Sequence, residues 1–265
     1  MNPSDPASDK LVERARYDER AGALLASGNL ADLGGDGAAG VPVELRAPYL
    51  AYEAQIRRVA APGRRVLDVC CGNGLHSLVA AACGAAVTVS DIAPHNVALA
   101  IRRAERAGQR VEGVVADAEH LPCDAASFDV VTCAGSLSYV DLELFLREVR
   151  RILRAGGRFV CVDSLNHNPL YRFNRYRRYR RGERSLSAIR RIPTVATIAR
   201  LRAAFPAGAE VGYFGIAAGA APLLRPLVGA ARTARIVDRF DRLLPGLRRY
   251  AFKFVFAGGT EERPR

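Results

Sequence analysis

Residues 65–91 of this chain read RVLDVCCGNGLHSLVAAACGAAVTVSD, and this stretch decides the fold. Its pattern predicts a buried strand, a turn containing two glycines, a helix over residues 75–83 and a second strand over residues 86–90. Asp91 follows at the carboxyl end of the second strand, where open α/β sheets bind ligands and where an acid can hold two ribose hydroxyls. The stretch therefore predicts a binding site for an adenosine compound.

Residues in and beside the glycine turn distinguish among adenosine compounds. A dinucleotide fingerprint has the form G-x-G-x-x-G, but Ser77 occupies the position of its third glycine. Asp68 lies inside the first strand, four residues before Gly72, where its charge would oppose a pyrophosphate and suit a cationic ligand. His76 lies in the same turn and is expected to position the helix that follows. The pattern favours S-adenosylmethionine over a nicotinamide dinucleotide.

Four blocks of the sequence resemble the successive motifs of class I S-adenosylmethionine-dependent methyltransferases. They are VLDVCCGNG, SDIAP, VVADAEHLPCDAASFDVVTC and LREVRRILRAGGRFVCVDS, and together they cover roughly residues 64–164. Cys70 and Cys71 stand where many members carry a Gly-Cys or Gly-Ala pair. The resemblance is to the small-molecule branch of the family. It implies an α/β fold with a Rossmann-like seven-stranded sheet, helices on both faces, an N-terminal helical lid, and insertions after the fifth and sixth strands.

The resemblance also implies a role for each residue at the cofactor site. Asp68 would hold the methionine end of S-adenosylmethionine, directly or through water, while Gly72 and Gly74 would let the chain pass close beneath it. Asp91 would bind the ribose diol. Asp117 would accept a hydrogen bond from the adenine amino group, although an acid there is also suited to capping a helix. The implied cofactor-binding residues are Tyr17, Asp68, Cys70, Gly72, Gly74, Asp91, Ile92, Asp117, Ala118 and Cys133.

The chain before the first strand predicts a lid. Residues 11–30 and 42–60 have helical patterns, and a glycine-rich linker separates them. In related methyltransferases such a segment folds over the cofactor, so Tyr17 is expected to touch cofactor or substrate; packing of the lid is the alternative. The expected division is a lid and linker over 1–60, a cofactor-binding core over 61–165, and substrate-side insertions with the last two strands over 166–265.

Methyl transfer is an in-line displacement, so the main task of the protein is to align nucleophile and methyl and to exclude water. A hydroxyl acceptor would also need a base. His167 follows the fifth predicted strand and is the predicted base, with capping or substrate hydrogen bonding as the alternative. Tyr139, after the fourth strand, is a second catalytic candidate, with packing as its alternative. Asn166, Tyr171 and Arg175 are predicted to contact the substrate.

The formal net charge is +12, and arginine supplies nearly all of the basicity because the chain has only two lysines. A basic cluster of this kind attracts phosphates, carboxylates, nucleic acid or an anionic membrane surface. A solvated helix face is the alternative. The cluster is opposed by a single acid, Glu183, and consists of Arg172, Arg175, Arg177, Arg178, Arg180, Arg181, Arg184, Arg190, Arg191, Arg200 and Arg202.

Composition fits one decorated α/β domain. The chain has 265 residues, of which 49% are hydrophobic, which excludes general disorder. Its six cysteines have no zinc-site spacing, so no metal is predicted and reduced core thiols are expected. The N-terminus lacks an apolar signal region, and no apolar run is long enough to span a bilayer, so the expected location is cytoplasmic.

We therefore expect an enzyme that methylates an oxygen or nitrogen of a small acceptor that is anionic, sugar-like or a natural product. A nucleic-acid methyltransferase is less favoured, because CAGSLSYV stands where an N-P-P-Y or D-P-P-Y tetrapeptide would follow the fourth strand. A lipid or quinone methyltransferase stays open, because residues 217–230 include an apolar stretch suited to peripheral membrane contact. A non-catalytic cofactor-binding protein is disfavoured, because the acids and glycines of the cofactor motifs are intact.

Overall fold

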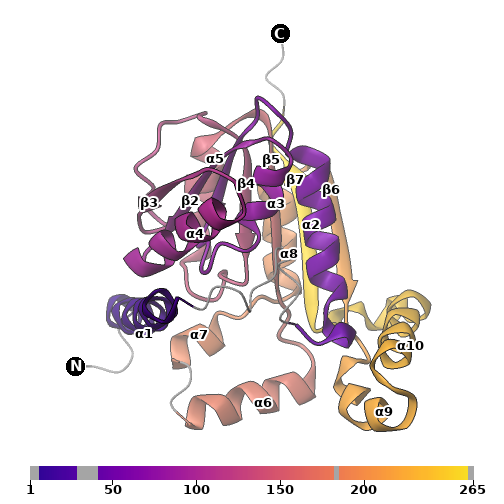
Figure 1. The fold of residues 1–265 in the computed structure, drawn as a ribbon. Coiled ribbons are helices and arrows are strands. Elements are labelled where there is room, and N and C mark those ends of the chain that lie inside the picture. The colour runs from indigo at the N-terminus through magenta and orange to yellow at the C-terminus, as the bar shows by residue number, and fades with distance from the viewer. Residues whose placement is uncertain (1–5, 29–40, 182–184, 262–265) are drawn as a thin grey trace.

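Seven strands form one sheet in the computed structural model, which describes residues 6–28, 41–181 and 185–261 (Figure 1). The first five strands run parallel, and the seventh is antiparallel to both of its neighbours. This confirms the predicted Rossmann-like sheet. In spatial order the strands are β3 (Val111–Val115), β2 (Ala86–Asp91), β1 (Arg65–Val69), β4 (Phe128–Ala134), β5 (Leu153–Ser164), β7 (Lys253–Gly259) and β6 (Ala207–Phe214).

Helices cover both faces of the sheet because its central strands are apolar on both sides. Val66 and Val160 point into one cluster and Leu67 and Phe159 into the other, as the alternation of side chains along a strand requires. The first face is covered by α2 (Ala47–Val59), α3 (Ser77–Ala82) and α4 (Pro94–Arg106), and the second by α5 (Leu142–Ile152) and α8 (Val195–Ala204).

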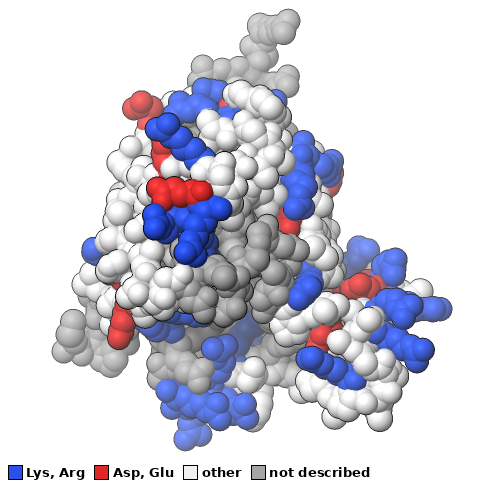
Figure 2. All heavy atoms as spheres, in the orientation of Figure 1, with Lys and Arg blue, Asp and Glu red and all other residues white. Residues whose placement is uncertain are grey.

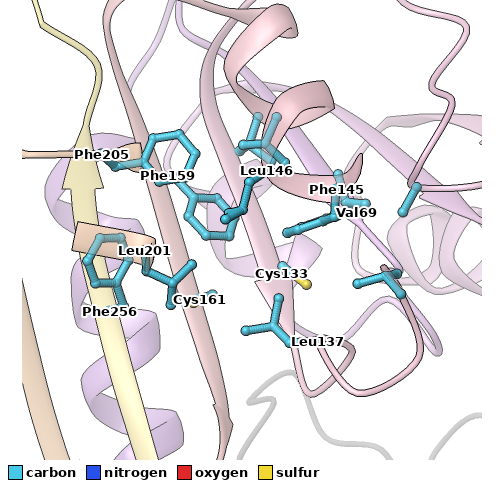
Figure 3. Close-up of a cluster of buried hydrophobic side chains, with 14 of the residues drawn as sticks. Val69, Cys133, Leu137, Phe145, Leu146, Phe159, Cys161, Leu201, Phe205 and Phe256 are labelled. Carbon is cyan, nitrogen blue, oxygen red and sulfur yellow. The ribbon is translucent and has the colours of Figure 1, made fainter. Parts of the chain in front are cut away.

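An aromatic cluster on the second face joins the parallel strands to the antiparallel pair (Figure 3). The ring centroids of Phe145 and Phe159 are 6.0 Å apart in an edge contact, and Phe205 lies 4.9 Å from Phe159. Phe256, on β7, lies 6.3 Å from Phe159. Aromatic rings bury large apolar areas, so this cluster fixes β7 against β5 and completes the sheet.

The N-terminal helix α1 (Pro6–Ser27) packs along α4. Ala21 lies in a small apolar cluster with Leu99, and the Asp18 carboxylate accepts hydrogen bonds from the backbone N–H of His95 and contacts its ring at 2.8 Å. The predicted lid helix is therefore present. The linker that was predicted to follow it lies almost entirely outside the described residues.

Both predicted insertions are helical. The connection after β5 contains α6 (Pro169–Arg180) and α7 (Leu186–Arg190) before α8, and the connection after β6 contains α9 (Ala221–Val228) and α10 (Ala230–Leu243). Short 3-10 helices at Ala218–Ala220 and Pro245–Tyr250 flank the second pair, and another, at Val43–Leu45, precedes α2. Figure 1 places α6, α7, α9 and α10 at one end of the molecule, beyond the sheet. No described helix has the length and apolar character needed to cross a bilayer.

Cys70 adopts a backbone conformation that favours glycine, with φ of 54°. Many members of the resembled family carry glycine at this position. The cysteine found here therefore has a strained backbone conformation. The six cysteines are all free thiols. Only Cys133 and Cys161 are fully buried, so the prediction of core thiols is confirmed for these two and overstated for the others.

Candidate functional site

A cavity of about 290 Å³ lies at the carboxyl ends of the parallel strands. Its floor comes from the segments that follow β1, β2, β3 and β4, as expected for an open α/β sheet. Helix α1 and the segment around α7 complete its walls. The cavity is lined by most of the predicted cofactor residues, namely Tyr17, Cys70, Gly72, Asp91, Ile92, Asp117 and Ala118.

Gly72 and Asp91 form the part of the floor suited to a ribose. The Gly72 N–H donates to one oxygen of Asp91 at 3.0 Å, and the Ala93 N–H donates to the other at 2.9 Å. Burial raises the pKa of Asp91, and the N–H donors of Ala93 and Gly72 act against that rise. A Cβ at Gly72 would meet no atom within 4 Å, so the main chain here is open to a ligand. Each carboxylate oxygen retains a lone pair for a hydroxyl.

Gly74 has a different role from the one predicted. Its φ is 76°, and a Cβ added there would lie 2.4 Å from the Cβ of Ala100 and 2.6 Å from its Cα. Gly74 does not line the cavity. The absence of a side chain therefore lets the turn pack directly on α4, rather than letting a ligand approach.

Asp68 lies beneath the turn and not at the cavity wall. One oxygen accepts the Thr132 hydroxyl at 2.9 Å, and the other accepts the Ser77 hydroxyl. Burial raises the pKa of Asp68, and these two hydroxyls act against the rise. The geometry favours a role for Asp68 in positioning the turn, and its contact with the methionine end, directly or through water, stays a prediction. Cys133 is likewise buried behind the wall, which is formed by its neighbours at positions 134 and 135.

Asp117 is already engaged in an ion pair. Lys10 of α1 lies 2.7 Å from an oxygen of Asp117 and 2.8 Å from Glu119. Burial lowers the pKa of Lys10, but its bonds to the two carboxylates raise it overall. Asp117 also accepts the N–H of Glu119 at 3.0 Å. An adenine amino group would share this carboxylate with the lid lysine.

Tyr17 and Tyr139 meet across the cavity. The Tyr17 hydroxyl donates to the Tyr139 oxygen at 3.1 Å, and the rings make an edge contact with centroids 5.9 Å apart. Burial, followed by the proximity of Tyr139, raises the pKa of Tyr17, so this phenol stays protonated. Both tyrosines line the cavity. The lid is therefore joined by a hydrogen bond to the segment that follows β4.

His167 is not placed to act as the base. Its Nε2 accepts the N–H of Val195, the first residue of α8, at 3.1 Å. It does not line the cavity. This position does not support the prediction of a base, because the chain after β5 turns away from the cavity; the contact with α8 favours the alternative of a capping residue.

The three predicted substrate residues also lie away from the cavity. Arg175 is buried and donates to the Leu165 carbonyl at 3.0 Å and to Asn166 at 3.4 Å. Tyr171 stacks on Phe252 with centroids 4.3 Å apart, and burial raises its pKa to about 12. These residues anchor α6 to the body of the protein, so the prediction that they contact substrate is not supported by their positions.

His76 is the histidine that lines the cavity, and its role was underestimated. Its ring stacks on Tyr49 with centroids 5.8 Å apart and 7° between the planes. Its Nδ1 faces Glu53 Oε1 at 3.4 Å, without hydrogen-bond geometry. Glu53 is fully buried on α2. Glu53 and His76 are far apart in the sequence, so their proximity became evident only from the position of α2 in the structure.

Arg191 is another cavity residue that stood out poorly in the sequence, where it was one of eleven clustered arginines. It follows α7, beside Ser185, Ser187 and Ala188, which line the same wall. No carboxylate in the described part of the chain lies within ion-pair distance of its guanidinium. Arg191 therefore brings to the cavity wall a positive charge that no described carboxylate pairs with.

Comparison with known proteins agrees with this geometry. The family described as "Methyltransferase domain" matches residues 67–161. A ubiquinone biosynthesis O-methyltransferase from Xanthomonas campestris is 40% identical over 114 residues, which are 42% of this chain and 47% of that protein. A protein with the same name from Cereibacter sphaeroides is 37% identical over 118 residues. The chain thus spans about half the length of the curated relatives it matches.

Solved structures share the fold over most of the chain. A Haemonchus contortus phosphoethanolamine N-methyltransferase covers 80% of this chain, and this chain covers 53% of it, at 18% identity and a TM-score of 0.56. The [4+2]-cyclase SpnF covers 81% of this chain, which covers 82% of it, at 19% identity and a TM-score of 0.54. Residues 67–161 therefore match a methyltransferase domain, and the sheet that contains them has the fold of these solved structures.

Proposed function

We propose that this protein transfers a methyl group from S-adenosylmethionine to an oxygen or nitrogen of a small anionic acceptor, either sugar-like or a natural product. The observation that carries the proposal is that one cavity joins the ribose floor at Asp91 to a second wall supplied by α1 and α7. The second wall contributes hydroxyls and Arg191, which forms no ion pair with a carboxylate of the described residues. A cofactor site without an acceptor would not need such a wall.

The residues present fit the cofactor. Gly72 leaves the main chain open, and Asp91 keeps lone pairs for a diol, while Ile92 and Ala118 offer apolar contacts for a base. When bound, S-adenosylmethionine supplies an electrophilic methyl group on a sulfonium. Asp91 and Asp117 would hold its adenosine part, and Cys70 lies beside Gly72 on the same floor.

Arg191 is the residue that selects an anionic acceptor in this proposal. A guanidinium binds a carboxylate or phosphate through paired hydrogen bonds. The sequence had suggested an anionic acceptor from the arginines of α6, and the same acceptor chemistry is now supported by an arginine at the cavity. Ser185 and Ser187 beside it offer hydroxyls to a polar acceptor such as a sugar acid.

His76 is the base in this proposal. Nδ1 lies 3.4 Å from the Glu53 carboxylate, and in the tautomer that carries its proton on Nδ1 the Nε2 atom has the lone pair that can take a proton from a hydroxyl acceptor. Tyr139, whose oxygen already accepts from Tyr17, orients the acceptor through its own O–H. Helix α1 excludes water from the reacting atoms.

Calorimetric titration with S-adenosylmethionine, S-adenosylhomocysteine and NAD tests the cofactor part of the proposal. We expect both sulfur nucleosides to bind the wild type and NAD not to bind. Asp91→Ala should lose that binding while its circular dichroism and melting curve show a folded protein. Binding of NAD alone, or unchanged affinity in the folded variant, would refute the cofactor site.

A pair of histidine variants tests the base. On a panel of phenolic and sugar carboxylates, His76→Gln should lower kcat by at least about 100-fold. Its affinity for S-adenosylhomocysteine should not change. His167→Gln is the matched control and should retain kcat. Equal kcat values in the two variants would exclude His76 as the base.

A lipid or quinone acceptor is the second candidate, supported by relatives that are named ubiquinone biosynthesis O-methyltransferases. Turnover of a phenol bearing a long apolar tail, with none of its tail-free counterpart, would favour it. A nucleic-acid acceptor would instead give RNA binding that weakens steeply with salt. A cytoplasmic location remains a prediction.

A further inference from the structure

Helix α6 exposes a row of large apolar side chains. Leu170, Phe173 and Tyr176 are 65%, 70% and 54% exposed. They are spaced by three residues, so they lie along one side of the helix. The helix itself is firmly attached, because Asn168 caps its start and donates to the Tyr250 carbonyl at 2.9 Å. Its apolar side is therefore a stable and largely exposed feature of the folded protein.

Helix α9 exposes two further leucines. Leu223 and Leu227 are 76% and 80% exposed, and their spacing of four residues places them on one side of the helix. Large side chains with exposures this high are unusual when they occur in groups. Gly229 separates this helix from α10.

The two apolar rows belong to one end of the molecule. Leu170 at the start of α6 lies against the 3-10 turn that leads into α9, since its Cδ1 would be 2.9 Å from a Cβ built on Gly219. Figure 1 shows both helices beyond the same end of the sheet. We call Leu170, Phe173, Tyr176, Leu223 and Leu227 together the apolar face.

The helices that carry the apolar face are also rich in arginine. Helix α6 contains no acidic residue, and Figure 2 shows basic side chains gathered over it and over the α9 and α10 region. Helix α10 has two acids: Asp241 is turned inward, where it accepts the N–H groups of Gly215 and Ile216 at 2.6 and 2.7 Å, and Asp238 is half-buried. The arginines of these elements include Arg172, Arg177, Arg180, Arg225, Arg232, Arg235, Arg239 and Arg242.

We propose that the apolar face docks on an anionic membrane surface. Exposed leucines and an aromatic ring amid arginines are suited to the boundary between acyl chains and anionic head groups, where each side chain finds its preferred surroundings. The charge selects this occupant over a second copy of the chain, because two copies would bring the same arginines together. The docking is peripheral, since no described helix is suited to spanning a bilayer. It does not depend on methyl transfer.

Vesicle flotation of the full chain tests the docking. The wild type should float with vesicles of phosphatidylcholine and phosphatidylglycerol and remain behind with phosphatidylcholine alone. The double variant Phe173→Ser/Leu227→Ser should bind at least about tenfold more weakly. Leu50→Ser is the matched control, because Leu50 is 48% exposed on α2, outside the apolar face, and it should bind like the wild type.

Charge variants complete the test. Replacing Arg177 and Arg180 by Gln should weaken binding by about fivefold each, whereas Arg102→Gln on α4 should have no effect. Affinity for S-adenosylhomocysteine should be equal in all variants, which separates this proposal from that of the cofactor site. Failure of the wild type to float, equal binding to neutral vesicles, or a dimer in sedimentation velocity that Leu227→Ser dissociates would each overturn the proposal.

Discussion

Replacing Gly74 by Ala should destabilise the protein far more than replacing Gly72. At both positions φ is positive, which costs a residue with a Cβ about 1–2 kcal/mol. At Gly74 the new methyl group would also lie 2.4 Å from the Cβ of Ala100, and overpacking of this kind costs about 1–3 kcal/mol. We therefore expect Gly74→Ala to lower the free energy of unfolding by roughly 2–5 kcal/mol. Gly72→Ala should lower it by about 1–2 kcal/mol.

Affinity for S-adenosylhomocysteine should fall more in Gly72→Ala than in Gly74→Ala. The methyl group of Gly72→Ala would point into open cavity space, where it should weaken S-adenosylhomocysteine binding by at least about tenfold, or ~1.4 kcal/mol. Any Gly74→Ala protein that folds should bind with nearly the wild-type affinity, since Gly74 does not line the cavity. Urea unfolding followed by circular dichroism, together with calorimetric titration, measures both quantities.

Gly108→Ala is the control for backbone strain alone. Its φ is 67°, it is exposed, and a Cβ there would meet nothing within 4 Å. The difference between the unfolding free energies of Gly74→Ala and Gly108→Ala isolates the contact with α4. If these two variants are equally stable, the steric argument is refuted. Wild-type affinity in Gly72→Ala would refute the role of Gly72 as cavity floor.

Two further predictions concern stability. Burial raises the pKa of Asp129, but the Arg65 backbone N–H and the Arg154 guanidinium lower it overall, so its stabilising effect is complete above the ordinary carboxyl pKa and is lost as the pH falls through the native value. Asp129→Asn should therefore show a smaller fall in Tm than the wild type below about pH 4, and parallel curves would contradict this. Tyr17→Phe removes the hydrogen bond to Tyr139 and should cost about 1 kcal/mol in urea unfolding, with no change in S-adenosylhomocysteine affinity. A loss of affinity would show that Tyr17 contacts the cofactor directly.

The cofactor floor was predictable because its determinants are local. Asp91 directly follows an apolar strand, and parallel strands bring their carboxyl ends to one edge, so sequence order alone brings it near Gly72. The two glycines of the turn look equivalent in the sequence, whereas their roles differ. Only the approach of α4 to Gly74, a contact between distant segments, separates them.

The acceptor side was not predictable from sequence because it depends on the path of long connections. His167 and Arg175 follow β5 directly, but the chain turns away there, since Asn168 begins α6 and is fixed to the Tyr250 carbonyl. Arg191 lies much later in the same connection, directly after α7, and it lines the cavity. Contacts between distant segments, such as that of Asn168 with Tyr250, decide which arginine of the cluster lines the cavity. Composition alone does not show this.

Helix α1 is attached by two kinds of contact, and this has a kinetic consequence. Its C-terminal half packs on Leu99 through apolar side chains, whereas its N-terminal half is held over the cavity by the Lys10 ion pairs and by Glu13, which accepts the Ser185 N–H at 3.4 Å. Salt screens charge pairs but leaves apolar packing intact. Added salt should therefore loosen only the half of the helix above the ligand, so that ionic strength sets how fast a bound nucleoside exchanges while the fold is unchanged.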